Sequence, residues 1–497
     1  MERAALYVLK TYLYKHTERT LGVDALTPTT GYLWISVFFG VYDLSPILVA
    51  VLSDTFLGAY KSIVLFGFVF VFGCVLILLQ GGSVIANTVP AAGIGLAGLL
   101  LVAASAGGLV QLLTAFGASQ FHPQAQSASG TRFFSLIFTA SNFGALLGIV
   151  VAISLYALTK RFSPLLFSVA GLALLGWVSF VAGSWLYVNR CVHAQTAQRT
   201  VSLMWNCVKR FSFEKNRTSN GGAFKDSLVD DVRLLFRLLP VFVCLIPCYL
   251  GQLQVTTTLR SIGYKLMRPE WGANKERVPI ELLLVTEPVT MILLSCLLNE
   301  VVFPFLQARR RLPTHLTRLT IAAGLVALGF VLAFVLQRVI MTAGTEVEVL
   351  ESVSMFYLIG PLMLFAAGQS LITSSGLELS YSHAPEALRA VSVSLFSTIY
   401  SLGSVVAVGL FGAMRGSLDE AGRRGFARVA SDSHGLTSRF DIYFAICAGL
   451  CLLGMAGLVA LRRFHAATRE MKIERAVERR AVEIALRRGL PERRPAA

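Results

Sequence analysis

Long apolar runs that lack charged residues follow one another along this chain. No Asp, Glu, Lys or Arg interrupts residues 62–80, 91–117, 133–159 or 163–188. A helix needs roughly 20 apolar residues to cross the hydrocarbon core of a bilayer, and in lipid the polar groups of a backbone are satisfied only within its own helix. Charged residues make up 14% of the chain, compared with about 25% in soluble domains. We therefore expect an all-α polytopic membrane protein.

The spacing of these runs predicts the domain organisation. We expect twelve spans, the first of them incomplete, at residues 2–15, 28–53, 62–80, 91–116, 133–158, 164–188, 235–259, 281–304, 317–337, 353–375, 388–413 and 441–461. Six helices, a polar linker and six more helices fit two parallel repeats related by an axis along the membrane normal. The predicted order is an N-terminal six-helix bundle, the linker, a C-terminal six-helix bundle and a basic amphipathic tail, at residues 1–188, 189–232, 233–462 and 463–497.

Basic residues indicate how the chain sits in the membrane. The formal net charge is +16, and Lys and Arg concentrate in residues 189–230, in Arg309–Arg311 and in the tail after Arg462. Because Lys- and Arg-rich loops stay cytosolic, we expect the linker and both termini on the cytosolic side. Contact with single-stranded nucleic acid needs aromatic residues among the basic ones, and the tail offers only Phe464. We expect no nucleic-acid binding; the tail lies at the lipid headgroups or docks a cytosolic partner.

Sequence patterns typical of enzymes and metal sites are not found. The eight cysteines are scattered along the chain with neither CxxC nor Cys/His metal spacing. No nucleotide-binding loop or nucleophile elbow occurs, and the acidic residues within the spans have no base beside them. We therefore expect no enzyme activity, no cofactor and no metal.

Several segments resemble motifs of one known family. They are PILVAVLSDTFLGAYKS (46–62), FGASQF (116–121), RFFSLIFTASNFGALLG (132–148), VDDVRLLFRLLPVFVCLIPCYLGQLQVTTT (229–258), GLELSYSHAP (376–385) and ERAALYVLKTYLY (2–14). In this order and at these spans they resemble the proton-coupled oligopeptide transporter family (POT/PTR, solute carrier 15-like) of the major facilitator superfamily. The ERAA of the last segment resembles the peptide/histidine branch of that family. The resemblance implies a fold of two six-helix bundles.

The same resemblance implies alternating access around a central site, with protons driving the uptake of di- or tripeptides or of histidine. Asp54 and Lys61 match the cytosolic hinge between family helices 2 and 3. Glu2 and Arg3 match the second glutamate and the arginine of family helix 1, and Glu378 matches the glutamate after helix 10. These five residues are therefore candidates for proton coupling and gating.

Three positions depart from the family pattern. The first glutamate of helix 1 would precede Met1, together with much of that helix, so we expect a truncated or misassigned start. Val110 stands where family helix 4 carries a basic residue, and Gln369 stands where helix 10 carries a glutamate. An amide donates and accepts hydrogen bonds but does not titrate. We therefore expect Gln369 to bind a ligand without passing on a proton.

Two acidic residues lie inside spans where the family usually has none, Asp43 in helix 2 and Glu287 in helix 8. An ionisable group at this depth costs about 3 kcal/mol or more and is a candidate functional residue by default. We predict that Glu287 recognises a substrate amino group and that Asp43 takes part in proton coupling. The alternatives are that Asp43 pairs with a neighbouring hydroxyl or basic residue, and that Glu287 caps a helix kinked at Pro288.

Other polar side chains interrupt apolar spans in helices 1, 4, 5 and 7. They are Tyr7, Lys10, Gln111, Asn142 and Gln254. Each alone more often forms an interhelical hydrogen bond than a ligand contact. As a set they are predicted to converge on one cavity and to form the substrate site together with Glu287 and Gln369.

These features predict a secondary active transporter of di- or tripeptides or histidine. The lost cation and carboxylate favour an alternative, a transport-impaired solute-carrier relative that acts as a membrane scaffold or sensor. The expected partners are a small peptide or amino acid, protons and the lipid bilayer, in the plasma membrane or an endolysosomal membrane. Substrate identity, proton coupling, organelle and oligomeric state stay open at the level of sequence.

Overall fold

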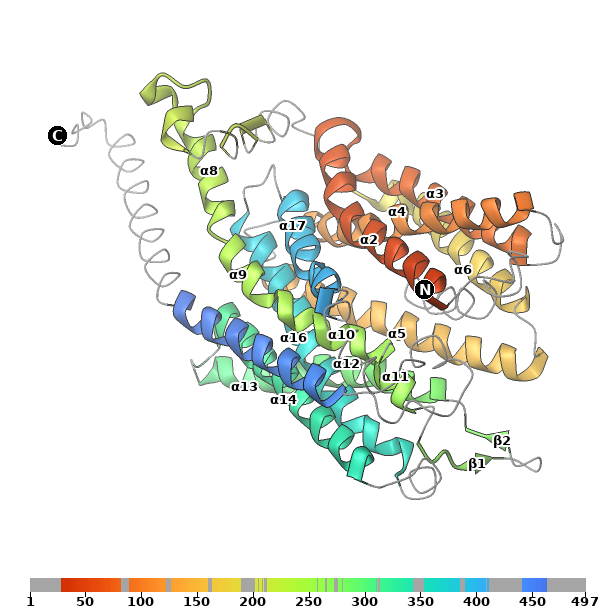
Figure 1. Cartoon of the computed structure of the whole chain (residues 1–497). Helices are drawn as coiled ribbons and strands as arrows, with labels where there is room; N and C mark the ends of the chain where they lie inside the picture. The colour runs from red at the N-terminus through yellow and green to blue at the C-terminus, as the bar shows by residue number, and fades with distance from the viewer. Residues whose placement is uncertain are drawn as a thin grey trace.

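The structure is a computed structural model of the whole chain (Figure 1). It describes residues 28–81, 89–121, 127–159, 163–188, 202–203, 205–207, 209, 212–256, 258–263, 266–271, 276–278, 280–309, 311, 313–342, 353–384, 389–407, 409–410 and 440–462. The predicted first span, with Glu2, Arg3, Tyr7 and Lys10, lies outside these residues, and so does the basic tail.

The N-terminal half starts with α2 (Pro28–Leu52), whose last turn passes into the π-helix η1 (Ser53–Leu57). It continues with α3 (Ala59–Gly81), α4 (Val89–Ser119), α5 (Ser127–Thr159), α6 (Ser163–Ala182) and η2 (Gly183–Leu186). Within this half α4 packs against both α2 and α3, and α3 packs against α6 (Figure 1). These helices are apolar around their whole circumference because some faces meet other helices and the rest meet lipid.

The C-terminal half contains more interruptions. Its elements are α9 (Leu239–Leu245), η5 (Ile246–Cys248), α10 (Tyr249–Thr256), α11 (Thr258–Gly263), β1 (Glu270–Trp271), β2 (Glu276–Arg277), η6 (Ile280–Val285), α12 (Thr286–Leu297), η7 (Leu298–Val302), α13 (Phe303–Ala308), α14 (His315–Thr342), η8 (Met355–Leu358), α16 (Ile359–His383) and α17 (Arg389–Ser401), followed by a helix at Phe440–Arg462. Pro240 and Pro247 lie in the first turns of α9 and η5. Proline lacks the N–H that a helix interior needs, so the seventh span is broken.

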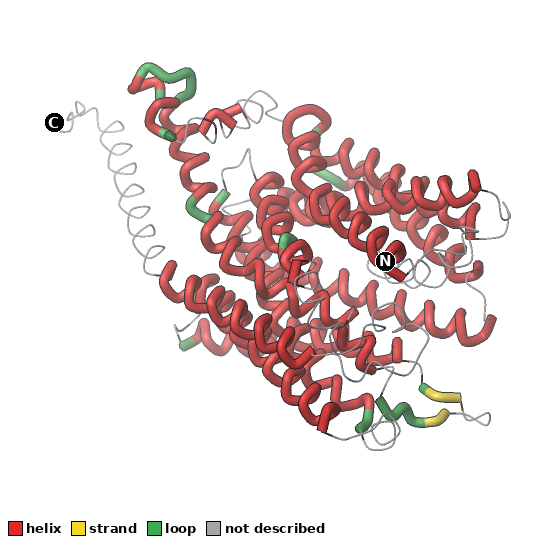
Figure 2. The backbone as a smooth tube through the Cα atoms, viewed as in Figure 1, coloured by secondary structure: helices red, strands yellow, loops and turns green. Residues whose placement is uncertain are grey.

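The described residues reproduce the predicted spans from the second onward. Among the described residues, nine helices are long and apolar enough to cross a membrane. Two shorter apolar helices, Gly40–Leu52 and Val391–Ala407, correspond to the two remaining predicted spans. Figure 2 shows helices joined by short loops, with β1 and β2 as an antiparallel pair of two-residue strands. Large side chains such as Leu48, Leu293 and Leu453 remain exposed on the helices. The prediction of an all-α polytopic membrane protein is confirmed.

The two halves meet chiefly along α2 with α17 and α5 with α12, and also along α4 with α17 and α5 with α16. Thr139 of α5 and Ser295 of α12 share a hydrogen bond of 2.9 Å between their hydroxyl oxygens. Phe138 of α5, Met291 of α12 and Ala366 of α16 form a small buried cluster. The polar residues discussed below lie close to this interface.

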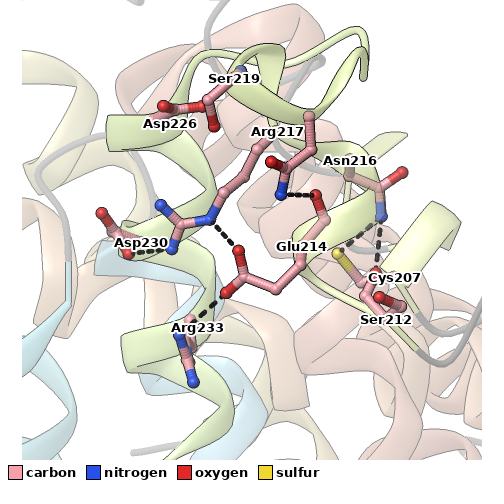
Figure 3. Close-up of polar contacts among 10 residues, drawn as sticks. Cys207, Ser212, Glu214, Asn216, Arg217, Ser219, Asp226, Asp230 and Arg233 are labelled. Carbon is pink, nitrogen blue, oxygen red and sulfur yellow. Dashed lines mark hydrogen bonds and ion pairs between the residues drawn. The ribbon is translucent and has the colours of Figure 1, made fainter. Parts of the chain in front are cut away.

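The linker has a folded polar part (Figure 3). It contains η3 (Glu214–Asn216), η4 (Thr218–Asn220) and α8 (Asp226–Phe236), and α8 crosses residue 232, where the sequence placed the linker's end. Arg217 pairs with Glu214 at 2.8 Å and with Asp230 at 2.7 Å, and Arg233 reaches Glu214 at 3.3 Å. These ion pairs hold η3 and the residue that follows it against α8.

The apolar side of the linker packs against both halves of the protein. Ala50 of α2 and Val391 of α17, one residue from each half, belong to one buried cluster with the linker region. The other members of this cluster are Leu203, Cys207, Val229, Val232 and Leu235. Burial raises the pKa of the Cys207 thiol, and a hydrogen bond from Asn216 at 3.4 Å opposes that rise. The linker is therefore anchored where α2 ends and where α17 begins.

A close approach of α2 and α4 supplies a test of the N-terminal packing. A Cβ atom at Gly107 would collide with the carbonyl oxygen of Tyr42, whereas at Gly176 on α6 it meets no atom of the described residues within 4 Å. We expect Gly107→Ala to lower the free energy of unfolding by about 1–3 kcal/mol, because overpacking forces the backbones apart. Thermal unfolding in detergent measures the effect, with Gly176→Ala as the control. Equal thermal midpoints for the two variants would contradict the close contact between Gly107 of α4 and the Tyr42 carbonyl oxygen of α2.

Candidate functional site

Gln254 of α10 is fully buried inside the C-terminal half. Its amide nitrogen donates to the Leu250 carbonyl oxygen at 3.0 Å and to the Tyr443 hydroxyl at 2.9 Å. Its amide oxygen accepts a hydrogen bond from the Thr258 hydroxyl. Donors and acceptor of Gln254 are thus engaged, and the amide ties α10 to the helix Phe440–Arg462.

Gln369 of α16 is also buried and engaged by its neighbours. Its amide nitrogen donates to the Gln252 side-chain oxygen at 2.8 Å and to the Thr373 hydroxyl at 3.3 Å. Its amide oxygen accepts from the Tyr400 hydroxyl. Gln369 therefore joins three helices, α10, α16 and α17, through one planar group.

Asp43 of α2 faces the C-terminal half. It is 8% exposed, and the Ser404 hydroxyl donates to one of its carboxylate oxygens at 3.0 Å. Ser401 and Tyr249 also form hydrogen bonds with this carboxylate. The hydroxyl pairing that the sequence left open for Asp43 is thus present, and it crosses between the two halves.

Three predicted residues lie within one helical turn of the buried cluster of Phe138, Met291 and Ala366. Asn142 is 1% exposed and donates to the Phe138 carbonyl oxygen at 2.8 Å. Glu287 is half-buried near the start of α12, which directly continues the 3-10 helix η6. The third residue is Gln369. The structure therefore brings α5, α12 and α16 together at the predicted site.

Gln111 of α4 differs from the other amides. Its side-chain oxygen is shielded from solvent and accepts no hydrogen bond from the described residues. A buried acceptor without a donor is costly, so a donor brought by a ligand or by water would stabilise it. Gln111 belongs to the N-terminal half, on the opposite side of the interface from Gln254 and Gln369.

The other described gating candidates are Glu378, Lys61 and Asp54. The Glu378 carboxylate lies 3.3 Å from Arg318 and 3.5 Å from His315, nine residues and so about 13 Å along α16 from Gln369. Lys61 is exposed near the start of α3. Asp54 lies in η1, between α2 and α3, and its side chain is outside the described part of the structure.

Several residues at the site were missed by reading the sequence. They are hydroxyl- and amide-bearing partners of the predicted residues: Tyr249, Gln252, Thr373, Tyr400, Ser404 and Tyr443. The spacing of Tyr249, Gln252 and Gln254 within a single span was the available signal. In the described residues, no group of three or more His, Cys, Asp or Glu side chains is arranged to hold a metal ion.

The two halves, each predicted as a six-helix bundle, are joined along α2/α17 and α5/α12, with polar residues between them. This is the architecture of a major facilitator superfamily transporter. The crystal structure of an auto-inhibited POT family peptide transporter superimposes with a TM-score of 0.69 at 20% identity, over 93% of this chain and 94% of that one. The POT family transporter PepTSo gives a TM-score of 0.68 at 18% identity, over 94% and 96% of the two chains.

The chain belongs to the POT family, whose sequence profile (PTR2) matches residues 60–415. Solute carrier family 15 member 1 of Canis lupus familiaris is 25% identical over 370 residues, which cover 68% of this chain and 50% of that protein. Peptide transporter family 1 of Drosophila melanogaster is 31% identical over 146 residues, 29% of this chain and 19% of that protein. The chain thus spans about 50% of the length of the first relative. The family predicted from the motifs is confirmed.

The bond between Gln254 and Tyr443 yields a stability prediction. Removing the hydroxyl in Tyr443→Phe leaves one amide hydrogen of Gln254 without its acceptor in a fully buried position. We expect the free energy of unfolding to fall by about 1–3 kcal/mol, the usual cost of an unsatisfied buried donor. Tyr357→Phe is the matched control, because Tyr357 is 64% exposed. A thermal midpoint as high as that of the control would contradict the structural role.

Proposed function

We propose that this chain is a secondary active transporter of small peptides or of an amino acid such as histidine, working by alternating access. The observation that carries the proposal is the hydrogen-bonded contact between Asp43 of one half and Ser404 of the other, beside a cluster of buried amides. Alternating access needs two halves that rock around a site between them. Membership of the POT family supports this function, and solved POT transporters hold a thioalcohol-conjugated peptide or 5-aminolevulinic acid.

The substrate lies, on this proposal, between α4 of one half and α5, α12 and α16 at the junction. Glu287 attracts the amino group of the ligand, since it carries a negative charge one helical turn from Met291 of the buried cluster. The polar residues that complete the site come from α4, α5, α10 and α16 and from helix 1: Gln111, Asn142, Gln254, Gln369, Tyr7 and Lys10. A small ligand with an amino group and several acceptor oxygens suits such a set.

Proton coupling is assigned to Asp43, because the helix 10 position carries an amide that does not titrate. The groups that face Asp43 are the hydroxyls of Ser404, Ser401 and Tyr249. The Ser404 hydroxyl donates to the carboxylate, and a proton on Asp43 would remove one acceptor position from this set. Protonation therefore changes the contact between the two halves directly. Glu2 and Arg3 would assist from helix 1.

The orientation in the membrane follows from the charges of the linker and tail. We infer that the linker, both termini and the gating residues Asp54, Lys61 and Glu378 face the cytosol, because Lys- and Arg-rich loops stay on that side. The membrane is the plasma membrane or an endolysosomal membrane. The basic tail lies at the lipid headgroups or binds a cytosolic partner.

A transport-impaired scaffold or sensor is the second candidate. The specific observation in its favour is that the amides of Gln254 and Gln369 are engaged by other side chains. Such bonds stabilise one arrangement of helices. A protein held in a single arrangement would bind partners through its linker or tail without moving a solute.

Uptake into proteoliposomes at two pH values separates the two candidates. For one coupled proton, an inward gradient of one pH unit corresponds to about 1.36 kcal/mol and drives about tenfold accumulation of labelled dipeptide or histidine. We expect Asp43→Asn to abolish this gradient dependence, because an amide in that place keeps an acceptor oxygen but holds no exchangeable charge. Ser404→Ala is the control, since it removes a bond between the halves and leaves the carboxylate. Gradient-driven uptake by Asp43→Asn would exclude the coupling role, and no uptake by the parent would favour the scaffold.

The role of Glu287 is tested in the same assay. Glu287→Gln keeps the shape of the side chain and removes its negative charge, so the attraction for a ligand ammonium is lost. We expect the KM for dipeptide to rise by at least about tenfold, the equivalent of one charge-assisted hydrogen bond. Glu300→Gln is the matched control on the following turns of the same span. An unchanged KM and pH response would show that Glu287 only caps α12.

A further inference from the structure

The face of α10 that carries Tyr249 is turned toward the N-terminal half. Tyr249 is the first residue of α10, and its side chain forms a hydrogen bond with Asp43 of α2. Gln252 follows three residues later, and residues three apart lie on the same face of a helix. Gln252 is only half-buried, whereas its neighbour Gln254 is fully buried. Gln252 therefore lies on the same face of α10 as Tyr249 and is less enclosed than Gln254.

The orientation of the Gln252 amide is set by a directional chain of hydrogen bonds. The Tyr400 hydroxyl donates to the oxygen of Gln369, and the nitrogen of Gln369 donates to the oxygen of Gln252 at 2.8 Å. The oxygen of Gln252 is thus turned toward α16. A primary amide carries two N–H donors on its other end, and those of Gln252 are the end of the chain that points away from Gln369.

We propose that Gln252 is a ligand-contacting residue that donates to an oxygen of the transported solute, and that Gln369 is the residue that positions it. This inference rests on the proposed transport function. The ligand oxygen belongs to a free carboxylate or to a peptide carbonyl group, both of which accept from an amide N–H. Val110 stands where a family cation is expected, so a neutral pair of donors on Gln252 replaces a charge as the partner for this oxygen.

The same chain explains why an amide serves better than a carboxylate at position 369. An ionised glutamate there would have no N–H to give and would accept from the nitrogen of Gln252. The Gln252 amide would then turn, and its oxygen would face the ligand. The groups around position 369 are the hydroxyls of Tyr400 and Thr373 and the amide of Gln252. Gln369 thus keeps the donors of Gln252 directed at the ligand at every pH.

Binding of alanyl-alanine to the purified full-length chain tests the inference independently of transport. The dissociation constant is measured from ligand-induced thermal stabilisation in detergent, and uptake kinetics are measured in proteoliposomes. Gln252→Glu replaces the two donors by an acceptor at almost the same volume. We expect its dissociation constant and KM to rise by at least about tenfold with little change in maximal rate, because a donor is lost and a repulsive oxygen is gained. Gln307→Glu, on the exposed surface of α13, is the control for added charge.

The positioning role of Gln369 requires a readout that a purely structural residue would not change. We expect Gln369→Glu to weaken binding where the new carboxyl group is ionised and to regain parental affinity at a pH low enough to protonate it, because a protonated carboxyl group donates again. A residue that merely packs would lower the thermal midpoint of the unliganded protein without making ligand affinity depend on pH. Parental affinity of Gln369→Glu at all pH values would overturn the positioning role.

The C-terminal amide of alanyl-alanine identifies the ligand oxygen. A larger effect of Gln252→Glu on the free dipeptide than on its amide assigns the carboxylate, and equal effects assign a peptide carbonyl. Parental affinity in both Gln252→Glu and Gln252→Leu would overturn the ligand contact. Binding without uptake by the parent would refute the transport proposal and leave the contact supported, and absence of binding by the parent would refute both.

Discussion

In hydrocarbon, each polar group of the chain needs a partner within the protein, and this constraint shapes both the helices and the site. Backbone groups satisfy it locally by forming helices. Polar side chains satisfy it either at a carbonyl of their own helix, as Asn142 does, or by reaching another helix, as Gln254 does with Tyr443 and Gln369 with Tyr400. The residues that make this chain a candidate transporter are therefore the same residues that hold its helices together.

The helices could be predicted from sequence because hydropathy over a span is a local property. The span expected at 28–53 is α2 (Pro28–Leu52), and the one expected at 317–337 is α14 (His315–Thr342). Irregularities were less accessible. The π-helix η1 at the end of α2 leaves no mark on hydropathy, and the packing of the linker on Ala50 and Val391 depends on where distant helices end.

Candidate polar residues could be named from sequence, but their partners could not. Ser404 lies 361 residues from Asp43, and Tyr443 lies 189 residues from Gln254. Which hydroxyl meets which amide depends on the register of helices that share no sequence signal. Gln252 shows the difficulty well, because only the contacts of Tyr249 and Gln369 reveal which way its side chain faces. Reading the sequence found the apolar spans and the acids, and the structure supplied the pairs.

The network has a gap that bears on how protons and ligand communicate. Asp43 is bound to Tyr249, and Gln252 is linked through Gln369 to Tyr400. Between these two groups lies an edge-on ring contact, Tyr249 against Tyr400, with centroids 5.1 Å apart and an interplanar angle of 89°. A ring contact transmits position and carries no proton. If Asp43 is the coupling group, its protonation acts on the ligand by shifting Tyr249 and α10 relative to α17, so the coupling runs through helix packing and needs no titrating residue in helix 10.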